Sequence, residues 1–465
     1  MATIRQNAFN GNWYVPGMGS KYKGELIHEE DENLWALHFT DRHDDASLTE
    51  LVRNPSKCIQ GELENGSCVL LVDLEARHAG GQLLAYDDYL LFPKYILEGI
   101  RTDSEAVELG YLAFDFDDIV HWSGMCHFHY RGDNVEWEQE PEVIFECSDH
   151  TLTVSPRRYG FMSFIPSRKI CLSQTVIFEL RPTSEKPLTW FIEMVDRVKS
   201  LIMLSIQRKT TLNELRFLQP EDSQHLNNDE HWPTERSLHI NYIRAEKTSD
   251  THFLNHLFNF SAIKEHPEIY KAWMDSYAKM KPIIDLRFLV FLHPDSPPEV
   301  IFLNLMQALE TYHARFICDK LKKYPDIIDR FIDEDLKFYD DQHRESYRSY
   351  LKENDSASSI TLKARLRFLF AIERFLYVPP ASKCGLDSFI QKLVDSRNYY
   401  THYNPKKENR AFKPDELPAI NALVSTLLDY YILKKVGYPH EELTSLIHER
   451  FVRLDDMIDN SLYRL

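Results

Sequence analysis

"GLDSFIQKLVDSRNYYTHY", residues 385–403, carries the helical period that sets the class of the carboxyl-terminal half of this chain. Its apolar residues stand three and four positions apart, which places them on one face of an α-helix. They are Leu386, Phe389, Ile390, Leu393 and Val394, and the next positions on that face are Arg397, Tyr400 and Thr401. The Asn404-Pro405 pair beyond is a typical helix stop. We therefore expect an amphipathic helix from near Leu386 to just before Pro405.

Arg397 and His402 are the residues of this helix that invite a chemical interpretation. A guanidinium is always charged, so burying it in an apolar stripe is costly unless it is paired or faces a polar cavity. His402 follows five residues later, roughly 140° around the helix axis. The two side chains would then flank a cleft at the helix end. A carboxylate-paired arginine and a capping histidine would give the same local pattern, so the spacing alone leaves both interpretations open.

The helical period extends over the second half of the chain, from about residue 250. It recurs in "HPEIYKAWMDSYAKM" (266–280), "PPEVIFLNLMQALETYHARFICDKLKKY" (297–324), "SITLKARLRFLFAIERFLY" (359–377) and "KPDELPAINALVSTLLDYYILKKVG" (413–437). We predict an all-α bundle over 250–465, with its core at about 298–440.

The first half has the period of strands instead. Apolar and polar residues alternate in "GELIHEE" (24–30), "NLWALHF" (33–39), "KCIQGELE" (57–64), "SCVLLVDL" (67–74), "PEVIFECSD" (141–149), "HTLTVSP" (150–156) and "KICLSQTVIFEL" (169–180). A helical stretch follows at "EKPLTWFIEMVDRVKSLIMLSIQ" (185–207), and "ERSLHINYIRAE" (235–246) could return to strand. We predict a β-rich domain over 1–245, a sandwich or a barrel-like arrangement, and hence an α+β fold class for the whole chain.

Composition excludes several classes of protein. The formal net charge of −18 disfavours non-specific adhesion to nucleic acid or to anionic membranes, so any RNA site must be a local basic pocket. Seven scattered cysteines without a C-x-x-C pair indicate reduced thiols. There is no apolar run long enough to span a membrane and no signal-peptide pattern at the start. We expect a cytoplasmic protein without membrane attachment.

The motif around Arg397 resembles the R-N-x-x-x-H signature of the HEPN superfamily, many of whose all-α domains are metal-independent ribonucleases. Arg397, Asn398 and His402 occupy its three positions. The upstream "NLMQALETYHARF" (304–316) is similar to the first helix of the Apea-like HEPN group, with Glu310 and His313 at polar positions. A β-rich region fused to such a domain resembles the bacterial ApeA-type anti-phage defence proteins.

The residues of the motif suit RNA cleavage. RNA supplies its own nucleophile, the 2′-OH, so a base, an acid and positive charge at the phosphate suffice. We assign His402 as general base or acid, Arg397 as the transition-state stabiliser and Asn398 as an orienting group, with no metal and no cofactor. The resemblance implies a homodimer in which two motifs face each other, and products with 2′,3′-cyclic phosphate and 5′-hydroxyl ends.

Further residues near the motif are candidates for supporting roles. Tyr399 and Tyr403 could stack on bases, and Lys406 and Lys407 could hold phosphates of bound RNA. The alternatives are that the tyrosines only pack against neighbouring residues and that the lysines belong to a solvated run of charged residues. Glu310 and His313 lie on one helix face, where Glu310 could neutralise Arg397 or orient His402; an ordinary hydrogen bond within the helix would explain them equally well.

Two other interpretations compete with a ribonuclease. A HEPN-like domain could use Arg397 and His402 only to bind RNA or a nucleotide, as a regulatory protein. A β-sandwich enzyme or lectin would need convergent polar residues in the first half, and none are identified there. His121, Cys126, His127 and His129 lack a standard metal-ligand spacing, so we expect no metal site. For a toxic effector of abortive infection, the β-rich domain would recognise a phage-derived trigger and hold the ribonuclease in check.

Overall fold

The computed structural model divides the chain into two compact units, which are described separately. The first comprises Met1–Ile206 and Thr210–Glu265, and the second Gln207–Lys209 and His266–Leu465. The polar boundary predicted at 245–250 lies outside the described residues. The structure describes residues 6–30, 33–40, 51, 55, 57–78, 89–102, 104, 106–117, 119–131, 134–139, 141–161, 171–220, 235–241, 256–317, 333, 340–342, 344–345, 348, 360–370 and 386–462.

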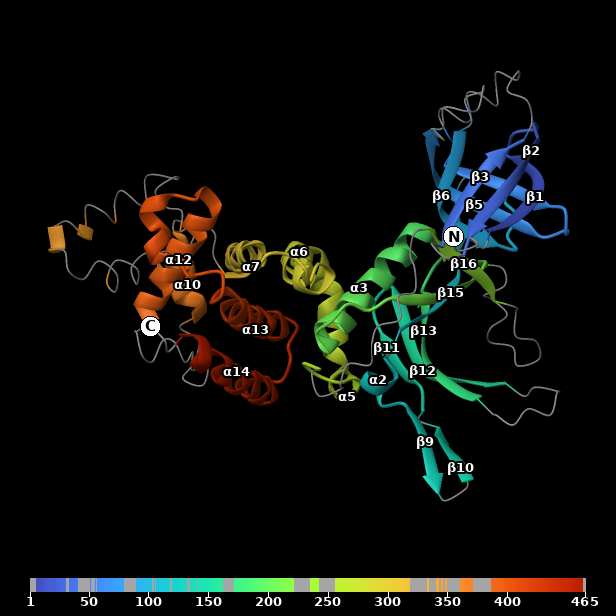
Figure 1. Ribbon diagram of the computed structural model, residues 1–465. Helices are drawn as coiled ribbons and strands as arrows, with labels where there is room; N and C mark the ends of the chain where they lie inside the picture. The colour runs from blue at the N-terminus through green and yellow to red at the C-terminus, as the bar shows by residue number, and fades with distance from the viewer. Residues whose placement is uncertain are drawn as a thin grey trace. The chain divides into compact units, whose positions relative to one another are not determined.

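A closed antiparallel barrel forms the start of the first unit (Figure 1). Its strands are β1 (Gln6–Tyr14), β2 (Tyr22–Glu29), β3 (Leu34–Phe39), β4 (Cys58–Leu63), β5 (Cys68–His78) and β6 (Tyr89–Glu98). They follow the order β6-β3-β2-β1-β4-β5, and the pairing of β5 with β6 closes the ring. Of the two arrangements left open by the sequence, the barrel is the one that forms.

The barrel interior follows the alternation of its strands. On β1, Gly11 and Trp13 are buried while Asn10 and Asn12 are exposed. Trp13 is fully buried, and a Cβ on Gly61 of β4 would overlap its ring. Glycine at that position therefore lets β4 approach the largest side chain of the barrel core.

A second group of strands continues from the barrel through one strand. β11 (Val143–Glu146), β12 (His150–Phe161), β13 (Cys171–Pro182), β8 (Tyr111–Phe116), β15 (Leu212–Leu218) and β16 (Arg236–Ile240) lie side by side in that order. β16 then pairs with β6, so it joins this sheet to the barrel. Helix α3 (Leu188–Ile206) packs against β8. The smaller elements are the hairpin β9 (Cys126–Arg131) and β10 (Asn134–Gln139), the pair β7 (Glu108–Leu109) and β14 (Lys186–Pro187), and the helices α2 (Val120–Ser123) and α5 (Phe260–Glu265).

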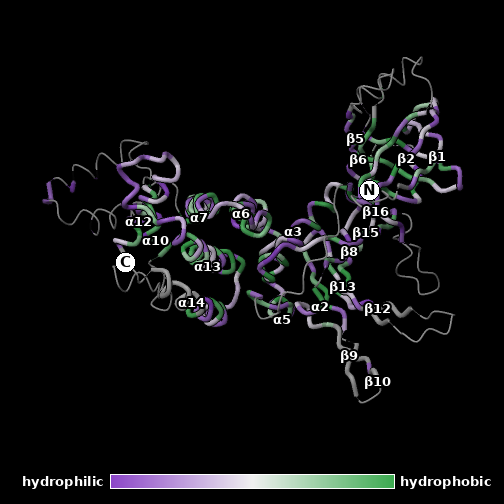
Figure 2. The backbone as a smooth tube through the Cα atoms, in the orientation of Figure 1, coloured by the Kyte–Doolittle hydropathy of each residue, from purple (hydrophilic) through white to green (hydrophobic). Residues whose placement is uncertain are grey.

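The second unit is helical. It contains α6 (Pro267–Leu292), α7 (Pro298–Tyr312), a π-helical turn (His313–Ile317), α10 (Leu362–Phe370), α12 (Leu386–His402), a 3₁₀ helix (Pro405–Arg410), α13 (Leu417–Lys435) and α14 (His440–Leu462). Hydrophobic and hydrophilic residues are interleaved along α6, α7 and α14, the pattern of amphipathic helices (Figure 2). The predicted α+β class, with a β-rich first part and a helical second part, is confirmed.

Helix α13 is the core element of the second unit. It packs against α6, α7 and α14, and most of its side chains are buried. Its Asp429 accepts two hydrogen bonds from Arg287 of α6, each 2.9 Å long, and both residues are almost fully buried. A buried charge is tolerated only when it is paired in this way. Among the described helices, none is both long enough and apolar enough to cross a bilayer.

Candidate functional site

The candidate site lies at the carboxyl end of helix α12. Its buried face contacts α7 and α10 and runs through Phe389, Leu393, Ser396 and Tyr400. The helix ends at His402 because Tyr403 takes a left-handed backbone conformation, with φ of 47°. Asn404 then caps the following 3₁₀ helix by accepting a hydrogen bond from the backbone N–H of Lys406. The predicted helix and its stop at Asn404-Pro405 are both present.

Arg397 lies at the edge of the buried face of α12. The sequence placed it within the apolar stripe, but the stripe continues through Ser396 and Tyr400 instead. The side chain of Arg397 is 36% exposed, and its Nη2 lies 3.9 Å from Oε2 of Glu310, which is 38% exposed. The guanidinium is thus partly solvated and loosely paired across α12 and α7, which leaves it accessible to an anionic ligand.

His402 and Asn398 project on the opposite side of the helix from the core. They are four residues apart, so they share one face, and His402 is exposed while Asn398 is half-buried. Within the described part of the chain, no hydrogen bond or ion pair engages either side chain. An exposed imidazole without a partner remains available to act on a substrate.

The tyrosines of the motif divide into a packing residue and surface residues. Tyr400 is buried, its hydroxyl donates to the carbonyl of Phe412 at 2.7 Å, and burial raises its pKa to about 12. Tyr403 is 62% exposed, and its ring lies edge-on to that of Tyr399, with centroids 5.6 Å apart. Tyr399 and Tyr403 therefore form a small aromatic surface next to His402.

The basic run after the helix is likewise split. Lys407 Nζ lies 3.4 Å from Oδ1 of the buried Asp395, so it is an internal partner of α12. Lys406 and Arg410 are exposed. The segment is held against α12 because Ser396 Oγ accepts the backbone N–H of Phe412 at 2.8 Å. The two exposed cations are therefore carried by an anchored segment next to the motif.

Glu310 and His313 do not act together. Glu310 faces Arg397, whereas His313 is buried at the start of the π-helical turn. Nδ1 of His313 lies 3.3 Å from Nη1 of Arg365 on α10, and its ring packs edge-on against Phe368. Sequence reasoning missed Arg365, although an arginine in the apolar period of "LKARLRFLF" was a signal of a paired buried cation.

The possible metal ligands of the first half fall largely outside the described side chains, so the structure does not test them. His127 and His129 belong to β9, whose side chains lie outside the described ones. Over the residues whose side chains are described, no group of three or more histidine, cysteine or carboxylate side chains is placed to hold a metal ion.

Comparisons with known proteins match both parts of the chain. Residues 8–273 match the family model of ApeA N-terminal domain 1, and residues 303–442 match that of the Apea-like HEPN domain. The second match includes most of α7 and all of α10 and α12, and thus Glu310, Arg397, Asn398 and His402. Neither the curated proteins nor the solved structures contain a significant match to the chain.

Proposed function

The chain belongs to the ApeA family of HEPN proteins, and from this premise we propose that it is a metal-independent RNA endonuclease with His402 and Arg397 as its catalytic groups. The observation that carries the proposal is the Arg397–Asn398–His402 set at the end of α12, with His402 exposed and the other two partly exposed, inside the matched HEPN domain. Imidazole titrates near neutral pH, and guanidinium binds phosphate oxygens in pairs.

The proposed reaction is an internal transfer of the phosphoryl group. A general base takes the proton of the 2′-OH, the 2′-oxygen forms a bond to phosphorus, and the bond from phosphorus to the 5′-oxygen breaks. A general acid protonates the leaving 5′-oxygen, which gives a 2′,3′-cyclic phosphate and a 5′-hydroxyl. Arg397 stabilises the negative charge that builds up on the phosphoryl oxygens. Asn398, on the same face as His402, orients the phosphate or the imidazole.

Glu310 is proposed to pair with Arg397 in the absence of RNA and to be replaced by the substrate phosphate. Its ion pair with Arg397 is long and half-exposed, and pairs of this kind contribute about 0.2–1 kcal/mol. A phosphate that binds the guanidinium with two hydrogen bonds exceeds this easily. Arg397 can therefore exchange Glu310 for RNA at small cost.

A homodimer supplies the second proton-transfer group. One chain carries one such motif, yet the reaction needs both a base and an acid. His402 is exposed at the end of a helix, a position that a second copy of the chain can reach. Two His402 side chains facing across a two-fold axis would serve as base and acid.

The RNA itself would be held next to the motif. Tyr399 and Tyr403 offer ring surfaces for unstacked bases, and Lys406 and Arg410 offer charge for backbone phosphates. Lys407 is less suited than the sequence indicated, because Asp395 already pairs with it.

The family supports a defence role for this activity. We assign the protein to anti-phage defence, as a cytoplasmic effector whose RNA cleavage aborts the infection. The first unit would recognise a phage-derived trigger and restrain the ribonuclease until then. An isolated helical unit no more toxic in cells than the full chain would contradict the restraint.

The test is to incubate the purified full chain with total cellular RNA in the presence of a chelator. His402→Ala is the active-site variant, and His448→Ala, which changes an exposed histidine of α14, is the matched control. The proposal predicts cleavage by wild type and His448→Ala but not by His402→Ala. If wild type binds RNA without cutting it and His402→Ala no longer binds, the domain is a binding module instead.

A further inference from the structure

A cavity of about 440 Å³ lies in the first unit where β16 joins the barrel. One wall consists of residues of the barrel core, Leu26, Trp35, Val69 and Ile96. The lining also includes Glu235 and the first two residues of β16, Arg236 and Ser237. Its volume lies within the range of small-molecule sites, and neither the proposed ribonuclease site nor its mechanism uses it.

Trp35 is the residue of this wall whose side-chain N–H lacks an acceptor among the described residues. It is 5% exposed. His28 stacks on its ring at 3.8 Å, with 9° between the planes. An occupant would therefore meet Trp35 at its edge, where the N–H lies. A buried donor without an acceptor is uncommon in folded proteins and calls for an explanation.

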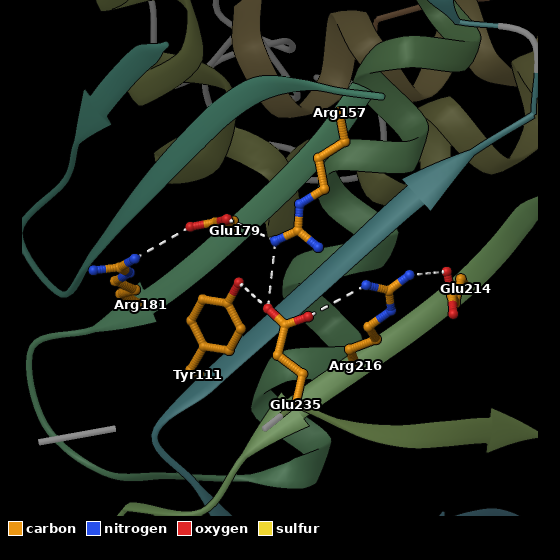
Figure 3. A network of polar contacts seen from close by, with 7 residues as sticks. All are labelled: Tyr111, Arg157, Glu179, Arg181, Glu214, Arg216 and Glu235. Carbon is orange, nitrogen blue, oxygen red and sulfur yellow. Dashed lines mark hydrogen bonds and ion pairs between the residues drawn. The ribbon is translucent and has the colours of Figure 1, made fainter. Parts of the chain in front are cut away.

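The charged groups of the lining are mainly carboxylates. Glu98 Oε1 is 2.9 Å from Nε2 of His239, which leaves its second oxygen for an occupant. Glu235 accepts hydrogen bonds from Tyr111 at 2.9 Å and from Arg157 and Arg216 at 3.4 Å (Figure 3). The guanidinium of Arg236 donates to Gln219 at 2.6 Å. Glu235 is thus already engaged by three donors, whereas Glu98 keeps an oxygen that can accept from a ligand. A carboxylate in this position favours a ligand that donates N–H groups over an anion.

We propose that this cavity binds an uncharged purine nucleoside. A purine ring provides the flat apolar surface that the barrel core and the half-buried Phe9 would cover. Guanine carries adjacent N–H donors for a carboxylate such as Glu98 and acceptors for the indole N–H of Trp35. Asn65 and Ser67, two exposed residues of the lining, can bind the ribose hydroxyls.

An occupant of the cavity can affect the neighbouring strands of the unit through Glu235. Glu235 lies in the wall, and its three partners come from β8, β12 and β15 (Figure 3). A nucleoside that displaces Glu235 would disturb the strand that joins barrel and sheet. Nucleoside binding at this cavity does not depend on the proposed ribonuclease activity.

The experiment is a calorimetric titration of the full chain with guanosine and, separately, adenosine. Trp35→Phe removes the N–H and keeps the ring, Glu98→Gln removes the carboxylate charge, and Trp190→Phe on α3 is the matched control. Guanosine is expected to bind wild type and Trp190→Phe alike. Losing one hydrogen bond should weaken binding about threefold to tenfold in Trp35→Phe and in Glu98→Gln.

Three results would overturn the proposal. The first is no binding of either nucleoside up to its solubility limit. The second is binding that neither Trp35→Phe nor Glu98→Gln weakens, which would locate the nucleoside elsewhere. The third is binding of N-acetyl-phenylalaninamide in the absence of nucleoside binding, which would identify the cavity as a pocket for an aromatic side chain of a protein partner.

Discussion

Arg397 of α12 and Glu310 of α7 face each other with Nη2 and Oε2 3.9 Å apart, both about one-third exposed. In the proposed mechanism Glu310 occupies the guanidinium until RNA replaces it. Glu310→Gln should therefore lower KM for RNA by up to about fivefold, the equivalent of an exposed ion pair worth up to about 1 kcal/mol. Steady-state kinetics with a defined RNA will measure this, and urea unfolding should show stability changed by less than about 1 kcal/mol. A large fall in kcat would instead assign Glu310 a direct role in orienting a catalytic group.

Arg397→Lys should lower the rate of the chemical step and leave the fold intact. Lysine keeps the charge but loses the paired donors, and removal of one transition-state contact typically costs about 10²-fold to 10³-fold in kcat. Single-turnover cleavage at saturating enzyme isolates this step. Arg77→Lys, at an exposed position of β5 outside the helical unit, is the control and should stay near wild type. Equal rates for all three proteins would remove Arg397 from the mechanism.

Activity in mixed dimers should report the shared site. Wild type is mixed with an increasing excess of His402→Ala chains at constant total protein, under conditions that allow subunit exchange. Only dimers of two wild-type chains then retain both proton-transfer groups. Cleavage should then fall with the square of the wild-type fraction. A linear fall would mean that each chain cleaves RNA alone, and sedimentation of the wild type as a monomer would agree with that.

Alkaline pH should destabilise the helical unit through Tyr400. Burial raises its pKa to about 12 in the folded protein, above the value of about 10 for an unfolded chain. The unfolded state therefore loses the proton first, and the stabilisation that is complete below about pH 10 disappears as pH approaches 12. Tyr400→Phe should be less stable at neutral pH by about 1 kcal/mol, for the lost bond to Phe412, and should show a shallower loss of stability above pH 10. Urea unfolding at several pH values compares the two proteins; identical alkaline slopes would contradict the assignment to Tyr400.

The buried pair of Arg287 and Asp429 should be the most sensitive ionic contact of the second unit. Asp429→Asn leaves the guanidinium buried without its counter-charge, which typically costs about 3–5 kcal/mol. Lys281→Met breaks the exposed pair with Asp285 on the same helix and should change stability by less than about 1 kcal/mol. Equilibrium unfolding of both variants measures the difference; equal effects would mean that the burial of Arg287 has little energetic consequence.

Local periodicity predicted many of the elements but not their long-range pairing. The seven predicted strands correspond to β2, β3, β4, β5, β11, β12 and β13, because each alternates apolar and polar residues. Of the six barrel strands, β1 and β6 were missed, since asparagine and glycine in "QNAFNGNWY" and Pro93 in "YLLFPKYILE" weaken the signal of a strand. Closure of the barrel depends on the pairing of β5 with β6, which no local pattern encodes.

The part of the candidate site that was predictable from the sequence lies on a single helix, α12. The motif and the end of α12 follow from spacing and from Asn404-Pro405, whereas the partners of its residues come from other segments. The pairing of Arg397 with Glu310 was one of several options, and the pairing of His313 with Arg365 was not foreseen. The stripe also shifted by one position, because Ser396 rather than Arg397 continues the buried face.

The most direct measurement uses an RNA that the protein cuts, prepared with either ribose or 2′-deoxyribose on the 5′ side of the cleaved bond and incubated in a chelator. We expect cleavage of the all-ribose RNA, with a 2′,3′-cyclic phosphate and a 5′-hydroxyl at the new ends, and no cleavage of the deoxy form or by His402→Ala. Cleavage of the deoxy form, a requirement for magnesium, or full activity of His402→Ala would contradict the proposed mechanism.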